Sequence, residues 1–377
     1  MKPTLLLLTT LTATTLAQGP LLPLAAPAPS MKSLDQIEPR TAISAGNNIT
    51  INLPGSYYLT GNITGPISIL ASDVTLDLNG FVITSSGVGI GIAGSPSYRN
   101  ITIRNGSIVG SGTMTFTGSV AGTFSGNTGT GIVAYGRSAG SVSGQNIRIE
   151  DINIRGFQKG IFLSTGEESD GGRHVISNCT IRDFGLNGIS VTQCVLRDTL
   201  VHHGAGSGVT GNAIVAQNLI VDRVVGSGVI GSNLNLEHTT VRSCSGNGIQ
   251  ATYSQISGGQ ITACADGISG SDNQIDRISV NSCTGSGIFS PNSSVTHATA
   301  AQNANAGIWA DSSTIAHCIV RFSGADGIRG VNSIVSNCKS SGNDTTTDGY
   351  LAAGIVWGGG RQIDNVCDLY APASPAP

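Results

Sequence analysis

The sequence predicts an all-β fold, a parallel β-helix with about 20 residues per coil in its C-terminal half. The first observation is a pair, Gly followed by Ile or Val, that recurs from Gly188 to Ile328 at successive spacings of 20, 20, 20, 19, 20, 20 and 20. A fixed period of this length is typical of a solenoid. The second observation is a composition of 53 Gly with only 11% charged and 5% aromatic residues, which suits many tight turns.

Each coil has three inward positions when the Gly of the recurring pair is counted as position 1. Position 2 is Ile or Val, and positions 9 and 14 are also apolar. Position 9 reads Leu196, Ala216, Leu236, Ile256, Ile275, Val295, Ile315 and Val335, and position 14 reads Val201, Val221, Val241, Ile261, Val280, Ala300 and Val320. A single coil cannot bury these side chains, but coils stacked about 4.8 Å apart bury them in continuous columns.

The ends of the chain differ from this pattern. Lys2, an apolar run from Leu5 and a small-residue end at Ala17 are typical of a secretory signal peptide. We therefore expect a secreted or cell-surface protein with a signal peptide at 1–17, a Pro- and Ala-rich tether at 18–32, a β-helix at 33–370 and a disordered tail at 371–377. The apolar run is too short for a membrane span, and no later stretch is long enough for one.

The N-terminal coils are less regular than the rest. Looser versions of the repeat follow Asn100 (NITIRNGSIVG), Asn146 (NIRIEDINIRGF) and Cys179 (CTIRDFGLNGI). Between the first two, residues 111–145 are rich in Gly, Ser and Thr, and we expect an ordered excursion from the solenoid there. Long loops on a repeat scaffold often carry the binding function.

The phrases PGSYYLTGNITG, SDVTLDLNGFVI and RNITIRNGSI carry a family resemblance. With the later repeats, the chain resembles secreted parallel β-helix repeat proteins of the pectate-lyase-like superfamily, in particular a bacterial branch, over residues 33–368. The resemblance implies a right-handed, single-stranded β-helix. Members of the superfamily include pectate and pectin lyases, polygalacturonases, alginate-modifying enzymes and non-enzymatic adhesins.

The resemblance does not transfer a catalytic residue. The Asn-Thr-Asp, Asp-Asp and Gly-His-Gly motifs of polygalacturonases do not occur, and neither do the Trp-Ile-Asp-His and Arg-x-Pro-x-x-Arg motifs of pectate lyases. Two functions therefore remain. One is polysaccharide binding, with cleavage of an acidic polysaccharide by β-elimination as its enzymatic form, and the other is a non-enzymatic adhesin or structural protein.

The strongest candidate site is an outward file at position 15 and its equivalents in earlier coils. It reads Arg104, Arg155, Arg182, His202, Asp222 and Arg242, with Arg321 further along. Stacked cations repel, so such a run favours a groove that binds the carboxylates of an acidic polysaccharide. A lyase would need a cation on the uronate carboxylate and a base for the neighbouring proton, which Arg182, His202 and Asp222 could supply. The alternative is a set of ordinary surface ion pairs.

A second candidate is the outward file at position 3, which carries Phe289, Trp309 and Arg329 on successive coils. An aromatic pair beside a cation would bind a sugar ring or a partner protein. The alternative is that the 111–145 excursion or the end of the chain covers these side chains.

Position 11 is a third polar file, with Asp198, Asn218, His238, Arg277, His297 and His317. His297 and His317 should be neighbours, but two histidines without a carboxylate or Cys partner make a poor metal site. We therefore expect solvated side chains and no metal. The sequence implies no cofactor, although calcium at Asp266 or Asp326 stays open beside their interpretation as turn residues.

The partners expected from these features are a polysaccharide, and an acidic one if the arginine file binds it. The formal net charge of −3 gives no argument for nucleic acid. We expect a monomer.

The eight cysteines share columns rather than forming an evident disulfide framework. Cys244, Cys264 and Cys283 fall at position 17, and Cys318 and Cys338 fall at position 12. Parallel side chains in a ladder are poorly oriented for a disulfide torsion, so buried, unpaired thiols are favoured over disulfides.

Overall fold

The computed structural model describes residues 40–44, 46–93, 98–135, 145–163, 173–343, 355–358, 360–367 and 370–372. All of them belong to one compact unit that begins at Arg40. The predicted signal peptide, the tether and most of the tail lie outside the described residues and stay predictions. Every regular element in the described ranges is a β-strand, and none of those ranges forms a helix that could cross a membrane.

The strands follow one another in short segments. The N-terminal strands are β1 (Thr41–Ile43), β2 (Asn47–Ile51), β3 (Gly55–Leu59), β4 (Ile63–Ile69), β5 (Val74–Asp77), β6 (Val82–Ser85), β7 (Ile90–Ala93), β8 (Arg99–Gly110), β9 (Thr113–Phe116), β10 (Gly122–Ser125) and β11 (Thr130–Tyr135). The middle strands are β12 (Gln145–Leu163), β13 (His174–Ser177), β14 (Thr180–Arg197), β15 (Leu200–Gly204), β16 (Ser207–Gln217), β17 (Ile220–Val224), β18 (Val229–Ser232), β19 (Asn235–Cys244), β20 (Ile249–Thr252) and β21 (Gln255–Thr262). The C-terminal strands are β22 (Ile268–Ser271), β23 (Gln274–Asp276), β24 (Ser279–Asn281), β25 (Ile288–Phe289), β26 (Ser294–Thr296), β27 (Thr299–Ala301), β28 (Ile308–Trp309), β29 (Thr314–Ala316), β30 (Ile319–Arg321), β31 (Ile328–Val331), β32 (Ile334–Ser336), β33 (Lys339–Ser341), β34 (Ile355–Gly358), β35 (Arg361–Ile363), β36 (Val366–Cys367) and β37 (Tyr370–Pro372).

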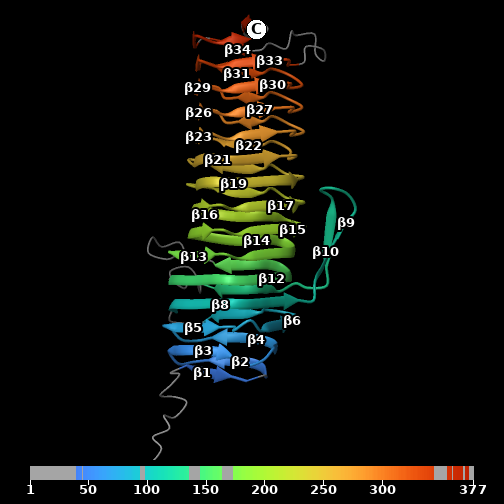
Figure 1. Ribbon diagram of the computed structural model, residues 1–377, viewed down its shortest axis with the longest axis vertical. Helices are drawn as coiled ribbons and strands as arrows, with labels where there is room; N and C mark the ends of the chain where they lie inside the picture. Colours follow the sequence, from blue (N-terminus) through green and yellow to red (C-terminus); the bar gives the residue numbers. More distant parts are fainter. Residues whose placement is uncertain are drawn as a thin grey trace, which may run out of the picture. The chain divides into compact units, whose positions relative to one another are not determined.

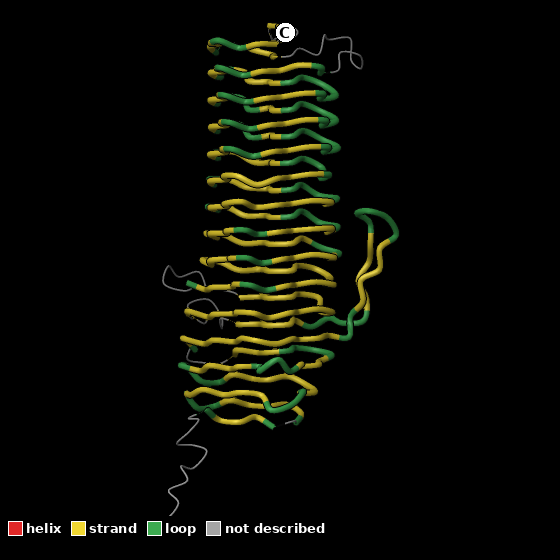
Figure 2. The backbone as a smooth tube through the Cα atoms, viewed as in Figure 1, coloured by secondary structure: helices red, strands yellow, loops and turns green. Residues whose placement is uncertain are grey.

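These strands stack in parallel from one coil to the next, as Figures 1 and 2 show. In the regular coils β25 pairs with β28, β26 with β29 and β27 with β30, each in parallel register, so one coil supplies three strands. The antiparallel pairing of β9 with β10 is the exception within the described ranges. The predicted parallel β-helix and its coil length are confirmed.

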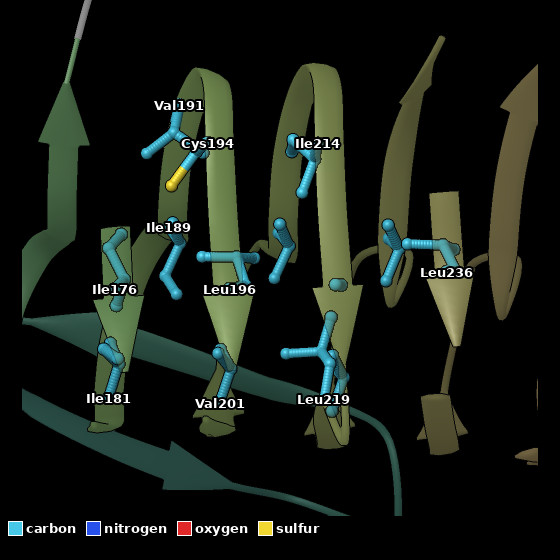
Figure 3. Packing of buried hydrophobic residues seen from close by; sticks show 14 of the residues in the cluster. Ile176, Ile181, Ile189, Val191, Cys194, Leu196, Val201, Ile214, Leu219 and Leu236 are labelled. Atoms are coloured by element: carbon cyan, nitrogen blue, oxygen red, sulfur yellow. The ribbon is translucent and has the colours of Figure 1, made fainter. Parts of the chain in front are cut away.

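The interior consists of the predicted columns. All the residues assigned to positions 2, 9 and 14 in the regular coils are buried, with at most 1% of each side chain exposed. Figure 3 shows Ile176, Leu196 and Leu236 of one column, and Ile181 and Val201 of another, pointing into the same interior. Burial of a continuous apolar column is the main force that holds the coils together.

Each regular coil bends at three single residues in the left-handed conformation. In one coil these corners are Asn292, His297 and Gln302, at positions 6, 11 and 16, with φ between 51° and 54°. One such residue interrupts the alternation of the strand, so that the residue after it also points inward. Asn is well tolerated in this conformation, which explains its frequency at these positions. The polar file predicted at position 11 is therefore one of the corners of the coil.

The corners also place polar side chains inside. At position 7, Ser254, Asn273 and Ser293 are almost fully buried. Each accepts a hydrogen bond from the backbone N–H of the coil before it, at 2.9 to 3.0 Å. This column satisfies backbone groups that the bend removes from the strand ladder.

Candidate functional site

The outward residues at position 15 form one file across successive coils. Arg155 of β12 is the register partner of Arg182 of β14, which is the partner of His202 of β15. Asp222 of β17 and Arg242 of β19 follow in the same file. The structure therefore places Arg182, His202 and Asp222 on adjacent strands, about 4.8 Å apart.

A groove with a volume of about 340 Å³ lies at the N-terminal end of this file. Its lining comes from β6, β8, β12 and β14, namely Val82, Ser107, Val109, Asn153, Ile154, Arg155, Thr180 and Arg182. The position 13 side chains in the groove are short, whereas the next two coils carry Leu200 and Ile220 at that position. The volume lies at the lower end of the range for small-ligand sites, about 300 to 1,000 Å³.

Two guanidinium groups border the groove. Within the described ranges, the Arg155 guanidinium has no hydrogen-bond or ion-pair partner. Arg182 Nη1 lies 3.2 Å from Asp183 Oδ2, and its side chain remains 43% exposed. An exposed pair of this kind is worth about 0 to 1 kcal/mol, so Arg182 is free to exchange its partner for a ligand. The groove therefore offers an uncompensated positive charge at Arg155.

His202 lies one coil beyond the groove. Partial burial lowers its pKa, the nearby His203 and Arg182 lower it further, and Asp183 and Asp222 oppose them. The His203 ring lies edge-on to it at 4.6 Å between centroids. His202 is consequently neutral near pH 7, with a ring nitrogen able to accept a proton.

Asp222 and Arg242 satisfy each other. Arg242 Nε lies 3.0 Å from Asp222 Oδ1, and the Arg242 side chain is 56% exposed. The alternative of ordinary surface ion pairs therefore describes this end of the file, whereas it does not describe Arg155.

The assignment of Arg104 to the same file is wrong. Its register partners are Asp77 and Glu150, and its Nη2 lies 3.2 Å from Asp77 Oδ2. Arg104 precedes the corner residue Asn105, whose φ is 59°, so it belongs to the position 10 file and Val109 takes position 15 in that coil. The sequence Ile-x-Ile-Arg-Asn is compatible with the corner at position 11 and with the corner at position 16. Spacing alone therefore assigned Arg104 to the wrong file.

Phe289, Trp309 and Arg329 stack on successive coils as predicted. The two aromatic rings meet edge to face at 5.1 Å, and Arg329 Cζ lies 4.2 Å from the centre of the Trp309 ring. The indole Nε1–H donates to Asp311 Oδ2 at 2.9 Å. These side chains lie at position 3, on a different face of the coil from the groove, and Arg329 already covers one face of the indole.

His297 and His317 are neighbours, with parallel rings 5.0 Å apart. His297 Nδ1 lies 3.0 Å from Asp276 Oδ1. In two stacked, parallel rings the nitrogen lone pairs point in parallel directions. They therefore do not converge on a common metal ion. In the described part of the chain, no group of three or more His, Cys, Asp or Glu side chains is arranged to hold a metal ion.

The prediction of buried, unpaired thiols is confirmed for seven of the eight cysteines, all except Cys367. Burial raises the pKa of Cys179 and of Cys283 to about 12. These thiols are protonated side chains of the interior and have no place in the candidate site.

Sequence reasoning did not place the hairpin of β9 and β10, which lies within the expected excursion and stands beside the solenoid in Figure 1. The Arg223 guanidinium lies 4.2 Å from the centre of the Phe116 ring and donates to the Gly118 carbonyl at 3.1 Å. Ser245 Oγ lies 2.8 Å from the Val120 carbonyl oxygen and 2.6 Å from the Val225 carbonyl oxygen, which share its one proton. After the hairpin, β11 returns to the solenoid and pairs with β7 and β12.

The hairpin borders the candidate file. Its contacts fall at positions 16 and 18. His203 and Arg223 directly follow His202 and Asp222, Ser245 lies three residues after Arg242, and the Phe116 ring lies 5.5 Å from that of His203. Phe124 packs where Gly185 leaves room, since a Cβ there would lie 2.5 Å from the Phe124 ring. Two features of the sequence are related to this docking, namely Gly185 and the alternation of Thr with larger side chains in β9 and β10. Neither feature shows from sequence alone that the hairpin packs against that glycine.

Comparisons with solved structures agree with this architecture. The A-module of the mannuronan C-5 epimerase AlgE6 from Azotobacter vinelandii is 13% identical, with a TM-score of 0.53 over 86% of this chain and 92% of that chain. The pre-mature gene product 12 of bacteriophage phi29 is 14% identical, with a TM-score of 0.56 over 84% of this chain and 52% of that chain. No protein-family model matches the sequence, and neither does any curated protein.

Proposed function

We propose that this parallel β-helix protein binds an acidic polysaccharide in the groove between β6 and β14. The observation that carries this proposal is the uncompensated Arg155 beside Arg182 in a groove of about 340 Å³. Both guanidinium groups line the same groove, so their positive charge borders a space large enough for a small ligand. Arg155 is therefore the residue expected to contact the ligand.

The groove suits a uronate in its chemistry as well as its charge. A guanidinium binds a carboxylate through two parallel N–H···O bonds, which are shorter and stronger than neutral hydrogen bonds. Ser107, Asn153 and Thr180 add hydroxyl and amide groups along the same floor. Such groups donate hydrogen bonds to sugar hydroxyls and accept them. Beyond the groove, the position 15 file continues the candidate binding surface along the direction in which the coils stack.

The structural comparisons support this proposal only through the fold. AlgE6 is named as a mannuronan C-5 epimerase, and mannuronan is a polymer of uronate residues. The phage protein shares the fold to a similar degree without such a name. Fold alone does not choose between them, so the argument rests on the groove.

Cleavage by β-elimination is a second candidate, favoured by the neutral His202 next to Arg182. In this reaction Arg182 binds the uronate carboxylate and so acidifies the adjacent C5–H. His202 takes that proton, the C4–O bond breaks with its electron pair on the leaving oxygen, and that oxygen takes a proton from solvent. The product has a C4=C5 double bond conjugated with the carboxylate, which absorbs in the ultraviolet.

The binding proposal is tested by calorimetry with the purified protein, a polyuronate and a neutral glucan. Arg155→Gln should weaken polyuronate binding roughly 10- to 100-fold, because it removes a charge-assisted hydrogen-bond pair. The matched control is Arg197→Gln, which removes an exposed cation from a position 10 file on another face. Equal affinities of the two variants would contradict the proposal.

The same preparations separate the two classes of function. Absorbance of the unsaturated product from pectate or alginate, with and without calcium, would demonstrate β-elimination, and loss of that signal in His202→Asn would assign the base. Failure of the wild-type protein to bind any glycan would favour the non-enzymatic adhesin or structural alternative. A secreted or cell-surface location is part of the proposal, and cleavage near Ala17 in an exporting host is its test.

A further inference from the structure

The C-terminal end of the position 15 face carries an unusual corner residue. Phe322 occupies position 16 with a φ of 55°, and 62% of its side chain is exposed. The same corner holds small or polar residues in the four coils before it, namely Ser243, Ala263, Ser282 and Gln302, whereas the bulky His203 and Arg223 at this corner contact the β9–β10 hairpin. A bulky side chain in this conformation is an outlier, and an exposed aromatic ring there gains little from burial. Folding alone therefore favours a different residue at this position.

At its corresponding corner, the following coil has no side chain that could cover the ring. Gly342 stands at the equivalent corner, and a Cβ on it would lie 2.8 Å from the Phe322 ring. The ring therefore rests on the backbone of the next coil, with its remaining surface toward solvent. Within the described residues, Phe322 does not belong to the buried apolar cluster.

Two cations precede the corner at which the ring stands. Arg321 precedes it in β30, and Lys339 lies in β33, paired through Ile319 with the same strand. Both side chains are exposed, and neither has a hydrogen-bond or ion-pair partner within the described ranges. An exposed aromatic ring next to Arg321, with Lys339 further back on the same face, matches the chemistry of an acidic sugar, which offers an apolar ring face and a carboxylate.

We propose that Phe322, Arg321 and Lys339 form a distal subsite for the same acidic polysaccharide, an inference that rests on the proposed function of the groove. Arg321 is in the same file as Arg182, seven strands further along. At about 4.8 Å per strand the two sites are about 34 Å apart. One ligand reaches both only if it is a polymer lying along the stacking direction.

The file between the two sites is electrostatically compatible with such a ligand, and the β9–β10 hairpin contacts the neighbouring positions 16 and 18. Position 15 reads His202, Asp222, Arg242, Thr262, Asn281 and Ala301 from one site to the other. The one carboxylate among them is neutralised by Arg242. Within the described ranges, no uncompensated acid on this file repels a polyanion between the groove and Phe322.

The test compares a uronate tetramer, which is shorter than the separation, with a long uronate polymer. Phe322→Asn should weaken binding of the polymer roughly three- to tenfold and leave binding of the tetramer unchanged. The same variant should raise the Tm by roughly 1 to 3 °C, because Asn is favoured in the left-handed conformation. Phe322→Tyr, which keeps the ring, should retain polymer affinity.

Tyr253→Asn is the matched control. Tyr253 is 67% exposed with a φ of 52°, but it stands at a position 6 corner away from the file. The Tm of the Tyr253→Asn variant should rise for the same reason, and its affinity for the polymer should not change.

Wild-type polymer affinity in Phe322→Asn, or a marked fall in its Tm, would overturn the distal subsite. In that case a loss of binding in Arg155→Gln still supports the groove. Equal polymer and tetramer affinities in the wild-type protein would also overturn the subsite, whereas an unaffected Arg155→Gln would overturn the proposed function itself.

Discussion

His174 is a buried histidine whose protonation should limit stability in acid. It begins β13 at an interior position 7, with 1% of its side chain exposed. Nδ1 accepts the Ile147 N–H at 3.3 Å, so Nε2 carries the proton, and Nε2 has no hydrogen-bond partner within the described ranges. Desolvation lowers the pKa from 6.5 to about 4.

The direction of the effect follows from the two pKa values. The unfolded chain takes up the proton below pH 6.5, whereas the folded chain resists it until about pH 4. The stability associated with neutral His174 is therefore complete above pH 6.5 and is lost as the pH falls toward 4. The whole difference corresponds to about 3 kcal/mol, at about 1.4 kcal/mol per pKa unit, and about 2 kcal/mol is already lost at pH 5.

The measurement is denaturant unfolding followed by far-ultraviolet circular dichroism at pH 8 and pH 5. His174→Asn is the informative variant, because Asn273 already occupies the same column. The unfolding free energy of the wild-type protein should fall by about 2 kcal/mol more than that of the variant between these pH values. His317→Asn, at an exposed corner, should follow the wild-type protein. Identical pH dependence of the wild-type protein and His174→Asn would refute the reasoning.

Two further predictions concern the interior. Ile275→Asp should cost several kcal/mol and abolish native circular dichroism at pH 7, because it places a charge between Ile256 and Val295, whereas Ile275→Val should cost about 1 kcal/mol. A native Ile275→Asp would contradict the inward assignment of position 9. The native protein should react slowly with a thiol reagent, since burial raises the pKa of Cys179 and Cys283, and the denatured, unreduced protein should react at its seven interior cysteines. Fewer than six would contradict free cysteines.

The regular coils could be predicted from sequence because one period fixes them. Positions 2, 9 and 14 are apolar in each coil, so the Gly-Ile spacing was sufficient to find Leu236 or Ile275 in the interior. The cysteines at positions 12 and 17 were expected in the interior, but the other inward residues at positions 7, 12 and 17 were missed, since many are Ser or Asn. A corner residue before each of them, often Asn, was the signal that could have revealed them.

The candidate site was harder to predict because its coils depart from the period. Arg155 and Arg182 were placed in one file, and the register agrees. Arg104 was misplaced because an inward residue, an outward residue and a corner residue follow one another both at positions 9 to 11 and at positions 14 to 16. Only the strand pairing distinguishes the two. The hairpin could not be placed at all, since its docking depends on Arg223 and Ser245, more than a hundred residues away in sequence.

The same irregularity explains where the groove lies. In a regular solenoid, side chains of similar size stack at the same position of successive coils. The outer surface along each file then has no depression. The N-terminal coils break this equality, because Ser107, Asn153 and Thr180 are short where Leu200 and Ile220 follow, and the chain leaves for the hairpin after Gly110. A depression therefore forms where the repeat is least regular, beside Arg155. The regular coils then contribute a file without uncompensated acid, along which a polymer held in that depression can extend.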